Sequence, residues 1–561
     1  MKIPVLVAML LVAVVLALPM PSADAQPNVR ALLDQGRYRE AIVVCNRALG
    51  KKPKQAKLYY QRGFALANLK QYPRALNDFT EAIKLNPNCV GALESRAHVY
   101  VLTGQTQLAI LDATRAIILD PKTGRNYSTR ALAYSDQGKY QNAVDDLTIC
   151  LRLAPKYALA YGNRGFAFNH LGQYERAVED CTKQLSLDPK SSWAYRQRAL
   201  SERYLGRHNE ALEDLNSAIR INSAEPASYV LRGLTYRSLY QAQRAIEDFN
   251  KAIALSAENT WTYRYCGWAY NELGEYRKAV DVCTKAIAFD QNDAVALATR
   301  SYSYARLGND ELCVQDCCAA IKLDPKNVDA YYNRACIHKR RGQFDKCIQD
   351  CDQALAINPS EHDAIVLRGY ANTILGRSAD SIKDWKKAIE LNSLDYRAYA
   401  SLANLYCELG RHDEEIDAYN NVLQIDPKQD VLYSRGFALG EVGMYEKAID
   451  DLTLKIARSP KNSWAYYRRG WTYGRLGEFQ KSIDDCNKSI ELDPSFTIVF
   501  QARGWAHLMH GEYLDSLSDY QTSLLKVPRL DQVLFANTSS DLKQAIAHAI
   551  DLVHACLLKT H

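Results

Sequence analysis

The sequence predicts an all-α solenoid built from about fifteen helical hairpins. The first observation is a proline that recurs about every 34 residues, and the second is a glycine that recurs at a fixed distance before it. Because proline cannot continue a helix, each proline marks the end of a helical unit. The prolines in phase are Pro53, Pro87, Pro121, Pro155, Pro189, Pro325, Pro359 and Pro427, followed after a shift of one residue by Pro460, Pro494 and Pro528.

The recurring glycine divides each unit into two helices. Glycine adopts the left-handed backbone that commonly ends a helix, so we expect a tight turn at each one. The glycines are Gly36, Gly104, Gly138, Gly172, Gly206, Gly274, Gly308, Gly342, Gly376, Gly410, Gly443, Gly477 and Gly511.

Each unit has an apolar stripe on both of its predicted helices. In the unit at 328–358, Tyr331 and Ala335 share one face of the first helix, and Phe344 and Cys351 share one face of the second. One hairpin cannot bury both faces by itself, so neighbouring hairpins must complete its core.

The N-terminus has the three parts of a secretory signal. Lys2 precedes an apolar run from Val5 to Leu18, and Ala23 and Ala25 form a small-x-small triplet. The run is short for a transmembrane helix, which needs about 20 residues. We expect cleavage after Ala25 and export to the periplasm or the extracellular space; the alternative is an uncleaved segment that anchors the chain in a membrane.

The period divides the chain into five parts. These are a signal peptide at 1–25, a truncated first hairpin at 26–55, eleven full units at 56–428, three further units at 429–530 after the loss of one residue, and a linker with a capping helix at 531–561. The capping helix is expected from Asp541 to Leu558, because its apolar residues form one stripe that can cover the last hairpin.

A charged pair recurs within the units. Arginine stands at the seventh position and aspartate follows at a constant distance, and two units lack both residues together, with Cys266 and Val282 in one and Leu402 and Ala418 in the other. Joint loss indicates that the two charges bind each other, so we expect an ion pair that ties the two helices of each hairpin. The pairs are Arg62 and Asp78, Arg96 and Asp112, Arg130 and Asp146, Arg164 and Asp180, Arg198 and Asp214, Arg232 and Asp248, Arg300 and Asp316, Arg334 and Asp350, Arg368 and Asp384, Arg435 and Asp451, Arg469 and Asp485, and Arg503 and Asp519.

These features together resemble the tetratricopeptide repeat (TPR) family. Glycine or alanine stands at the eighth position, as in Gly63 and Ala97, an aromatic residue precedes the second helix, as in Tyr72, and proline closes the unit. The resemblance runs from about Val29 to Pro528. It implies a right-handed superhelix with a concave groove and a role in binding protein or peptide partners.

The resemblance also implies which residues line the groove, namely the second, fifth, ninth, twelfth and thirteenth positions of the first helix. In the middle units these positions carry basic residues against only Glu272 and Asp329, which favours an extended acidic segment as the partner. The basic residues are Arg196, Arg203, Arg237, Arg264, Arg306, Lys339 and Arg340. In the last units the same positions carry aromatic residues typical of binding anchors, including Trp464, Tyr467, Trp471 and Trp505.

The 15 cysteines leave two interpretations open. Six of them occupy a position that is apolar in the other units, which favours simple packing in the core: Cys45, Cys181, Cys283, Cys317, Cys351 and Cys486. The alternative is a ligand-binding, metal-binding or disulfide-stapled cluster between Cys313 and Cys351, although a zinc-type Cys-x2-Cys spacing is missing there.

No known catalytic motif and no cofactor or metal motif occurs in the sequence. A net charge of +6 over 561 residues is too small to indicate nucleic acid as a partner. We therefore expect an exported, non-enzymatic scaffold or adaptor, in envelope assembly or another multiprotein complex, that touches a membrane only if the signal stays uncleaved. The sequence leaves the oligomeric state open.

Overall fold

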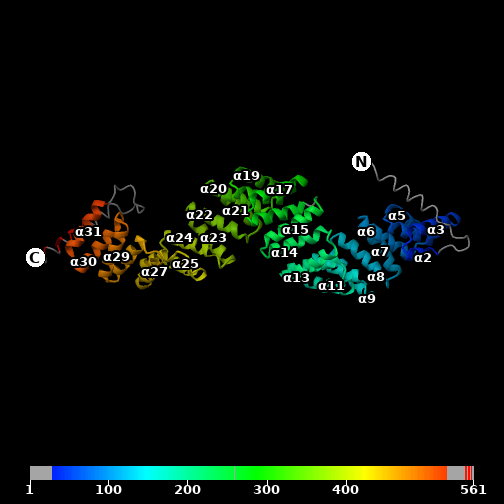
Figure 1. Cartoon of the computed structure of the whole chain (residues 1–561), viewed down its shortest axis with the longest axis horizontal. Helices are drawn as coiled ribbons and strands as arrows, with labels where there is room; N and C mark the ends of the chain where they lie inside the picture. The colour runs from blue at the N-terminus through cyan, green and yellow to red at the C-terminus, as the bar shows by residue number, and fades with distance from the viewer. Residues whose placement is uncertain are drawn as a thin grey trace. The chain divides into compact units, whose positions relative to one another are not determined.

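A computed structural model describes residues 28–257 and 260–526, together with six isolated positions between 547 and 558. Within these residues thirty helices and no strand occur, and consecutive helices pair into fifteen hairpins, α2 with α3 through α30 with α31 (Figure 1). The protein is thus an all-α solenoid. The chain divides into two compact units, unit 1 up to Phe289 and unit 2 from Asp290.

Unit 1 contains eight of the hairpins. Its helices are α2 (Val29–Asp34), α3 (Tyr38–Lys51), α4 (Ala56–Asn68), α5 (Tyr72–Leu85), α6 (Val90–Leu102), α7 (Thr106–Leu119), α8 (Gly124–Asp136), α9 (Tyr140–Leu153), α10 (Ala158–His170), α11 (Tyr174–Leu187), α12 (Ser192–Tyr204), α13 (His208–Ile221), α14 (Pro226–Ser238), α15 (Ala242–Leu255), α16 (Thr260–Glu272) and α17 (Tyr276–Phe289).

Unit 2 contains the other seven. Its helices are α18 (Ala294–Arg306), α19 (Asp310–Leu323), α20 (Val328–Arg340), α21 (Phe344–Ile357), α22 (His362–Ile374), α23 (Ser378–Leu391), α24 (Tyr396–Glu408), α25 (His412–Ile425), α26 (Leu432–Glu441), α27 (Tyr445–Arg458), α28 (Ser463–Arg475), α29 (Phe479–Leu492), α30 (Ile498–His510) and α31 (Tyr513–Lys526). Helix α26 has ten residues, whereas the other first helices of unit 2 have thirteen. It follows the stretch where the sequence period loses one residue.

The turn between the two helices of a hairpin depends on a left-handed residue. All thirteen recurring glycines have a positive φ, from 67° at Gly410 to 89° at Gly511. Two other residues with positive φ, Lys70 and Tyr240, stand at the same point of their units, although side chains disfavour this conformation.

Small residues let the two helices of a hairpin approach closely. In α4 and α5, Ala75 and Ala82 are fully buried, and a Cβ added to Gly63 would lie 2.8 Å from the Phe79 ring. Apolar clusters then continue from one hairpin to the next, as where Phe79 joins residues of α6 such as Leu93. The core is therefore a series of local clusters shared by neighbours, as expected for stacked repeats.

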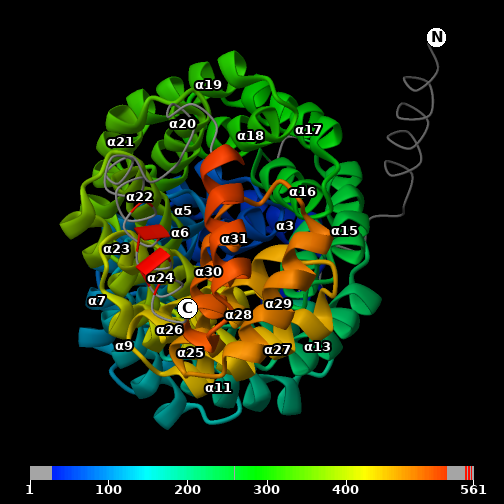
Figure 2. The same cartoon turned by 90° about the vertical axis from the view of Figure 1, so that its left-hand side faces the viewer.

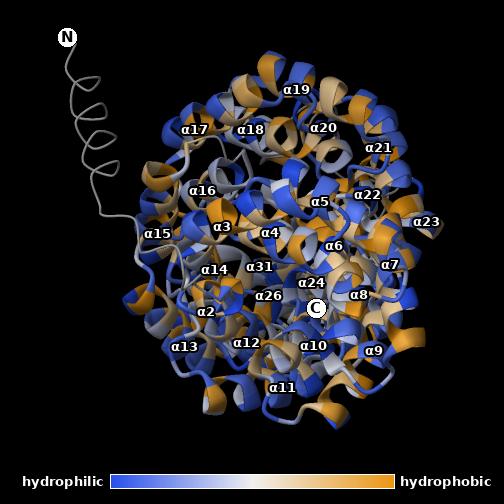
Figure 3. Cartoon of the chain, turned by 90° about the vertical axis from the view of Figure 1, so that its right-hand side faces the viewer, coloured by the Kyte–Doolittle hydropathy of each residue, from blue (hydrophilic) through white to orange (hydrophobic). Residues whose placement is uncertain are grey.

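Where the views separate the two helices of a hairpin, the first helix lies on the inner side and the second on the outer side (Figures 2 and 3). In unit 2, α20, α22 and α24 lie inside α19, α21 and α23 (Figure 2), and in unit 1, α10 and α12 lie inside α9, α11 and α13 (Figure 3). We call the exposed side of the first helices the inner face of each unit. Apolar and polar residues alternate along the helices (Figure 3), and no described helix has the length and apolar character needed to cross a membrane.

Two parts expected from the sequence fall outside the described residues. The signal peptide at 1–25 is one of them. The capping helix from Asp541 to Leu558 is the other, apart from isolated positions within it.

Candidate functional site

The structure brings the arginine and aspartate of each of the twelve pairs together through two parallel hydrogen bonds. Between α8 and α9, Arg130 Nε and Nη2 donate to the two carboxylate oxygens of Asp146, both at 2.7 Å. The hydrogen bond to Asp146 raises the pKa of Arg130 above its ordinary value. Since the aspartates are buried and accept two hydrogen bonds from the arginine, each pair ties the two helices of its hairpin together.

The arginines also reach the preceding hairpin, which the sequence analysis did not anticipate. Arg130 Nη1 donates to Thr114 Oγ1 of α7, 3.2 Å away, so one guanidinium joins three helices. The acceptors are Asn46, Thr80, Thr114, Thr148, Thr182, Asn216, Cys318, Asp352, Asn420, Thr453 and Asn487. These acceptors recur just after the aspartate position, and this recurrence is the sequence signal that could have revealed the contacts. We call the row of arginine–aspartate pairs and these acceptors the ion-pair ladder.

Tyrosine rings flank the ladder and account for part of the unusual number of tyrosines, 36 against 12 phenylalanines. The Arg130 guanidinium lies 5.9 Å from the ring centres of both Tyr127 and Tyr134. Such cation–π contacts recur along the array, and the hydroxyl of Tyr127 donates to the backbone oxygen of Pro121 at 3.2 Å. The tyrosines therefore support the ladder.

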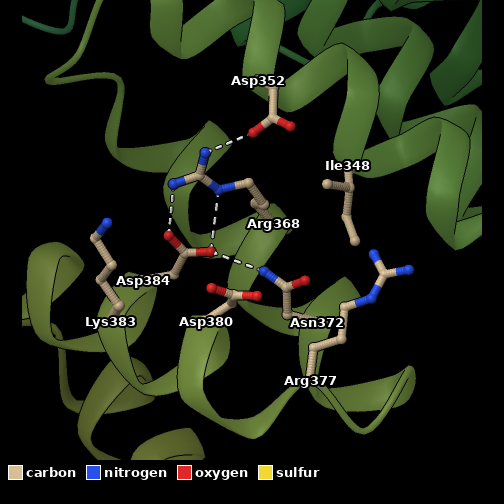
Figure 4. Close-up of a pocket in the computed structure, with 8 residues that line it drawn as sticks. All are labelled: Ile348, Asp352, Arg368, Asn372, Arg377, Asp380, Lys383 and Asp384. Atoms are coloured by element: carbon tan, nitrogen blue, oxygen red, sulfur yellow. Dashed lines mark hydrogen bonds and ion pairs between the residues drawn. The ribbon is translucent and has the colours of Figure 1, made fainter.

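A small niche opens beside the ion pair where the flanking aromatic residue is missing. In α22, Asn372 replaces it and donates to Asp384 Oδ2 at 3.1 Å, leaving a cavity of about 250 Å³ (Figure 4). Arg377 and Asp380 complete its outer wall (Figure 4). A similar cavity of about 420 Å³ lies beside Leu439 in α26. We call these sites ion-pair niches.

Three of the seven predicted basic groove residues form ion pairs within the chain. Arg237 Nε donates to Glu272 at 2.5 Å, and Arg196 pairs with Glu225 at the start of α14. In unit 2, Arg340 pairs with Asp310 at the start of α19. These ion pairs neutralise three of the seven basic residues. Two of the carboxylates, those of Glu225 and Asp310, stand outside the repeat positions that line the groove.

The remaining basic residues differ in environment. Arg264 is buried against Trp261, and the Lys339 ammonium lies 4.3 Å from the Tyr370 ring centre. Arg306 is exposed. Arg203 lies over the Tyr204 ring, and its Nε is buried without a hydrogen-bond partner in the described part of the chain. Arg203 Nε is thus a buried donor on the inner face that lacks a hydrogen-bond partner among the described residues.

Tryptophan is concentrated on the inner faces. Six of the seven tryptophans occupy the second or ninth position of the repeat, on α12, α16, α28 and α30, and Trp385 alone lies in the core. Trp261 is 60% exposed and Trp464 is 51% exposed. Trp471 and Trp505 are half-buried because each ring lies beside a glycine of the preceding hairpin, Gly440 and Gly474 respectively.

Tyr467 differs from its predicted neighbours. It is buried, with its ring centre 5.2 Å from that of Phe496, and the Trp464 ring centre lies 4.1 Å from that of Phe496. Tyr467 thus supports the exposed Trp464 ring through Phe496 and offers little surface of its own.

The cysteines between Cys313 and Cys351 do not form a metal-binding arrangement among the described residues. Cys313, Cys317, Cys347 and Cys351 are buried in apolar clusters as free thiols. Among the described residues, the one group of three potential ligands with converging atoms contains no cysteine. Burial raises the pKa of Cys181, another core thiol, to about 12, which keeps that thiol protonated.

One further polar residue of the first helices is used internally. The Asn333 amide donates to Ala298 O at 3.1 Å and Ser301 Oγ at 3.0 Å. These bonds link α20 to α18, so the Asn333 amide nitrogen is committed to hairpin stacking.

Comparison with solved structures finds several repeat proteins. The APC/C hetero-tetramer Cut9-Hcn1 is 16% identical, with 85% of this chain and 95% of that chain covered and a TM-score of 0.41. A tetratricopeptide repeat protein from Parabacteroides merdae is 22% identical, covering 43% of this chain and 95% of its own, at a TM-score of 0.36. YrrB, described as a TPR protein with an unusual peptide-binding site, is 21% identical, covering 34% and 97%, at a TM-score of 0.29. A search of curated proteins found no match.

Family models give the assignment directly. Three models, each described as tetratricopeptide repeat, match at 56–89, 328–361 and 463–496, at 128–192 and 375–430, and at 226–259 and 294–327. The matches extend across both units and lie within the repeat array of the structure. With its paired helices, glycine turns and closing prolines, this chain belongs to the tetratricopeptide repeat family, whose fold is a scaffold for protein interactions.

Proposed function

We propose that this protein is an exported scaffold that binds extended segments of other proteins on its inner faces. The observation that carries the proposal is the placement of six of the seven tryptophans at inner-face positions, with Trp261 and Trp464 more than half exposed. Exposed aromatic rings on a surface formed by rigid helices are typical anchors for a protein partner. The signal-like N-terminus supports the exported location.

The aromatic strip of unit 2 is the stronger of two candidate sites. Trp464, Trp471 and Trp505 lie on α28 and α30, and Ile498 and Met509 add exposed apolar surface on α30. Burying this surface under a partner would release water from apolar groups, which favours association. An extended segment with apolar side chains suits this strip.

The inner face of unit 1 suits a segment that also carries acidic residues. Arg203 there has a buried Nε without a hydrogen-bond partner among the described residues; Trp193 lies on the same helix, α12, and Trp261 lies on α16. A carboxylate from a partner could bond to this guanidinium, whereas Arg196 and Arg237 already have carboxylates beside them. We propose the acidic segment for this site alone.

Affinity capture with the mature chain, Gln26 to His561, tests the proposal. Three variants accompany it: Trp464→Ala with Met509→Ser for the strip of unit 2, Arg203→Glu for unit 1, and Leu454→Ser as a control. Leu454 is an exposed residue of α27, an outer helix.

We expect the partner to be lost with one of the inner-face variants and retained with the control. Loss with Trp464→Ala and Met509→Ser assigns the strip, and loss with Arg203→Glu assigns the basic site. Capture by both inner-face variants at the level of the unmodified chain would contradict inner-face binding.

A further inference from the structure

The last hairpin carries a cluster of ligand-type side chains that the scaffold function does not use. His507 near the end of α30, and Glu512 and Asp515 at the start of α31, place three potential ligand atoms within 4.8 Å of one another. His507 Nδ1 lies 2.5 Å from Glu512 Oε2. The sharp turn at Gly511, with φ of 89°, brings the two helix ends together.

The second nitrogen of His507 faces a carboxylate of the ion-pair ladder. His507 Nε2 lies 3.8 Å from Asp519 Oδ2, and Asp519 is buried and held by Arg503 through bonds of 2.8 and 2.5 Å. Once a metal ion takes Nδ1, a carboxylate near Nε2 can hold the remaining ring proton on Nε2, which is the arrangement that supports histidine as a metal ligand. His507 is therefore oriented by a fixed element of the fold.

We propose that His507, Glu512 and Asp515 form a binding site for a divalent transition-metal ion such as Zn²⁺. One imidazole nitrogen and two carboxylates are ligands that Zn²⁺ accepts in a three-ligand site whose fourth position is open to water. Arg503 and Asp519 neutralise each other, so Glu512 and Asp515 leave two negative charges to balance the ion. Binding displaces the proton shared by His507 and Glu512 and joins α30 to α31.

A second hairpin of the same chain provides an internal comparison. In α20 and α21 the residues at the equivalent repeat positions are His338, Gln343 and Lys346. His338 Nδ1 lies 2.8 Å from Gln343 Oε1, and its Nε2 lies 3.7 Å from Asp350 Oδ2, so the histidine has the same surroundings. An amide and an ammonium replace the two carboxylates, which removes the charge that a cation needs.

The two hairpins are thus matched in backbone and histidine and differ in the proposed ligands. Both histidines occupy the position that Asn372 holds in the ion-pair niche of Figure 4. This repeat position therefore carries different side chains in different repeats, and of the two hairpins with histidine there, the last one has the two carboxylates.

Isothermal titration of the mature chain with Zn²⁺ tests the proposal. A double variant, Glu512→Gln and Asp515→Lys, is titrated in parallel, because it copies the residues beside His338. The reciprocal variant is Gln343→Glu with Lys346→Asp. His507→Tyr gives an independent loss variant, because Tyr473 stands at this position in α28. Co²⁺ absorption separates nitrogen and oxygen ligands from thiolates, which is needed in a chain with 15 cysteines.

We expect the unmodified chain to bind one equivalent of Zn²⁺ at this site. Both loss variants should bind that Zn²⁺ ion about tenfold more weakly or not at all. The Co²⁺ spectrum of that equivalent should lack thiolate bands, and the reciprocal variant should gain an equivalent. The proposal would be overturned if the two loss variants bound Zn²⁺ with unchanged stoichiometry and affinity. It would also be overturned if the Co²⁺ ion lost in these variants had shown thiolate absorption bands. No gain in the reciprocal variant would contradict the role of the two carboxylates as deciding ligands.

Discussion

The Trp505 ring lies so close to Gly474 of the preceding hairpin that a Cβ on Gly474 would approach within 2.8 Å of it. Gly440 stands in the same relation to Trp471 but at 3.5 Å, an ordinary contact distance. Trp471 and Trp505 are therefore held in place by the hairpin before them. Such rings lose little conformational entropy when a partner binds, which favours their use as anchors.

Alanine at the two glycines should have opposite effects on stability. Gly474→Ala forces the Trp505 ring to move, and overpacking of this kind lowers the free energy of unfolding by about 1 kcal/mol or more. Gly440→Ala meets no clash and should raise it by about 0.5 kcal/mol, because alanine is the better helix former. Urea denaturation measures both changes. A stabilising Gly474→Ala would contradict the seating of Trp505 on Gly474.

Removing one charge of an arginine–aspartate pair should lower the free energy of unfolding more than removing both charges. Asp146→Ala leaves the Arg130 guanidinium without its carboxylate and should lower the free energy of unfolding by about 3 kcal/mol. Adding Arg130→Leu should recover part of this loss, as the natural pair of Leu402 and Ala418 suggests. Denaturation of the single and double variants checks this. If the double variant were less stable than Asp146→Ala, Arg130 would stabilise the fold even without the Asp146 carboxylate, which would contradict the pairing argument.

Glycine at Tyr240 should stabilise unit 1. Tyr240 has φ of 57° in a hairpin turn and its side chain is 97% exposed, so it carries backbone strain and makes little packing. Tyr240→Gly removes a left-handed strain of about 1 kcal/mol. The midpoint of thermal unfolding should rise. Tyr240→Ala is the control that keeps the strain, and an equal rise with alanine would rule out the backbone as the cause.

The stability of unit 2 should depend on the ionisation of Glu415. Its side chain is fully buried, and burial raises its pKa, while His412 Nδ1, 2.9 Å away, opposes the rise and Glu441 adds to it. The folded state thus prefers the protonated acid. The penalty of ionisation is absent below the unfolded pKa of about 4.3 and grows as the pH rises above it.

Glu415→Gln removes this penalty. We expect the variant to gain stability over the unmodified chain at pH 7 and to lose that advantage at pH 4. Thermal unfolding of both proteins across this pH range measures the difference. A constant difference at all pH values would mean that Glu415 ionises as readily in the folded chain as in the unfolded one.

The features that follow from a single repeat could be predicted from the sequence. The glycine turns and the pairing of Arg130 with Asp146 depend on residues of one hairpin at a fixed spacing, so the repeat period reveals them. Contacts between repeats were harder to predict. The carboxylates of Glu225 and Asp310, which neutralise Arg196 and Arg340, stand at the starts of helices in other hairpins, outside the positions that line a groove.

The same reason explains what was missed around His507. Its position is aromatic in most repeats, which predicts a core residue without a carboxylate partner. Glu512 lies beyond the turn at Gly511, and only the geometry of that turn brings its carboxylate to the ring. Chemistry specific to one repeat is hidden by a pattern that is read across all of them.

Photo-crosslinking tests inner-face binding most directly. Benzoylphenylalanine would replace Trp464 on the inner face of α28 and, in a separate protein, Leu454 on the outer helix α27, both of which are about half exposed. In cells that make the protein, the account predicts crosslinks to another protein from position 464 and none from position 454. Crosslinks from position 454 alone would contradict it and place binding on the outer helices.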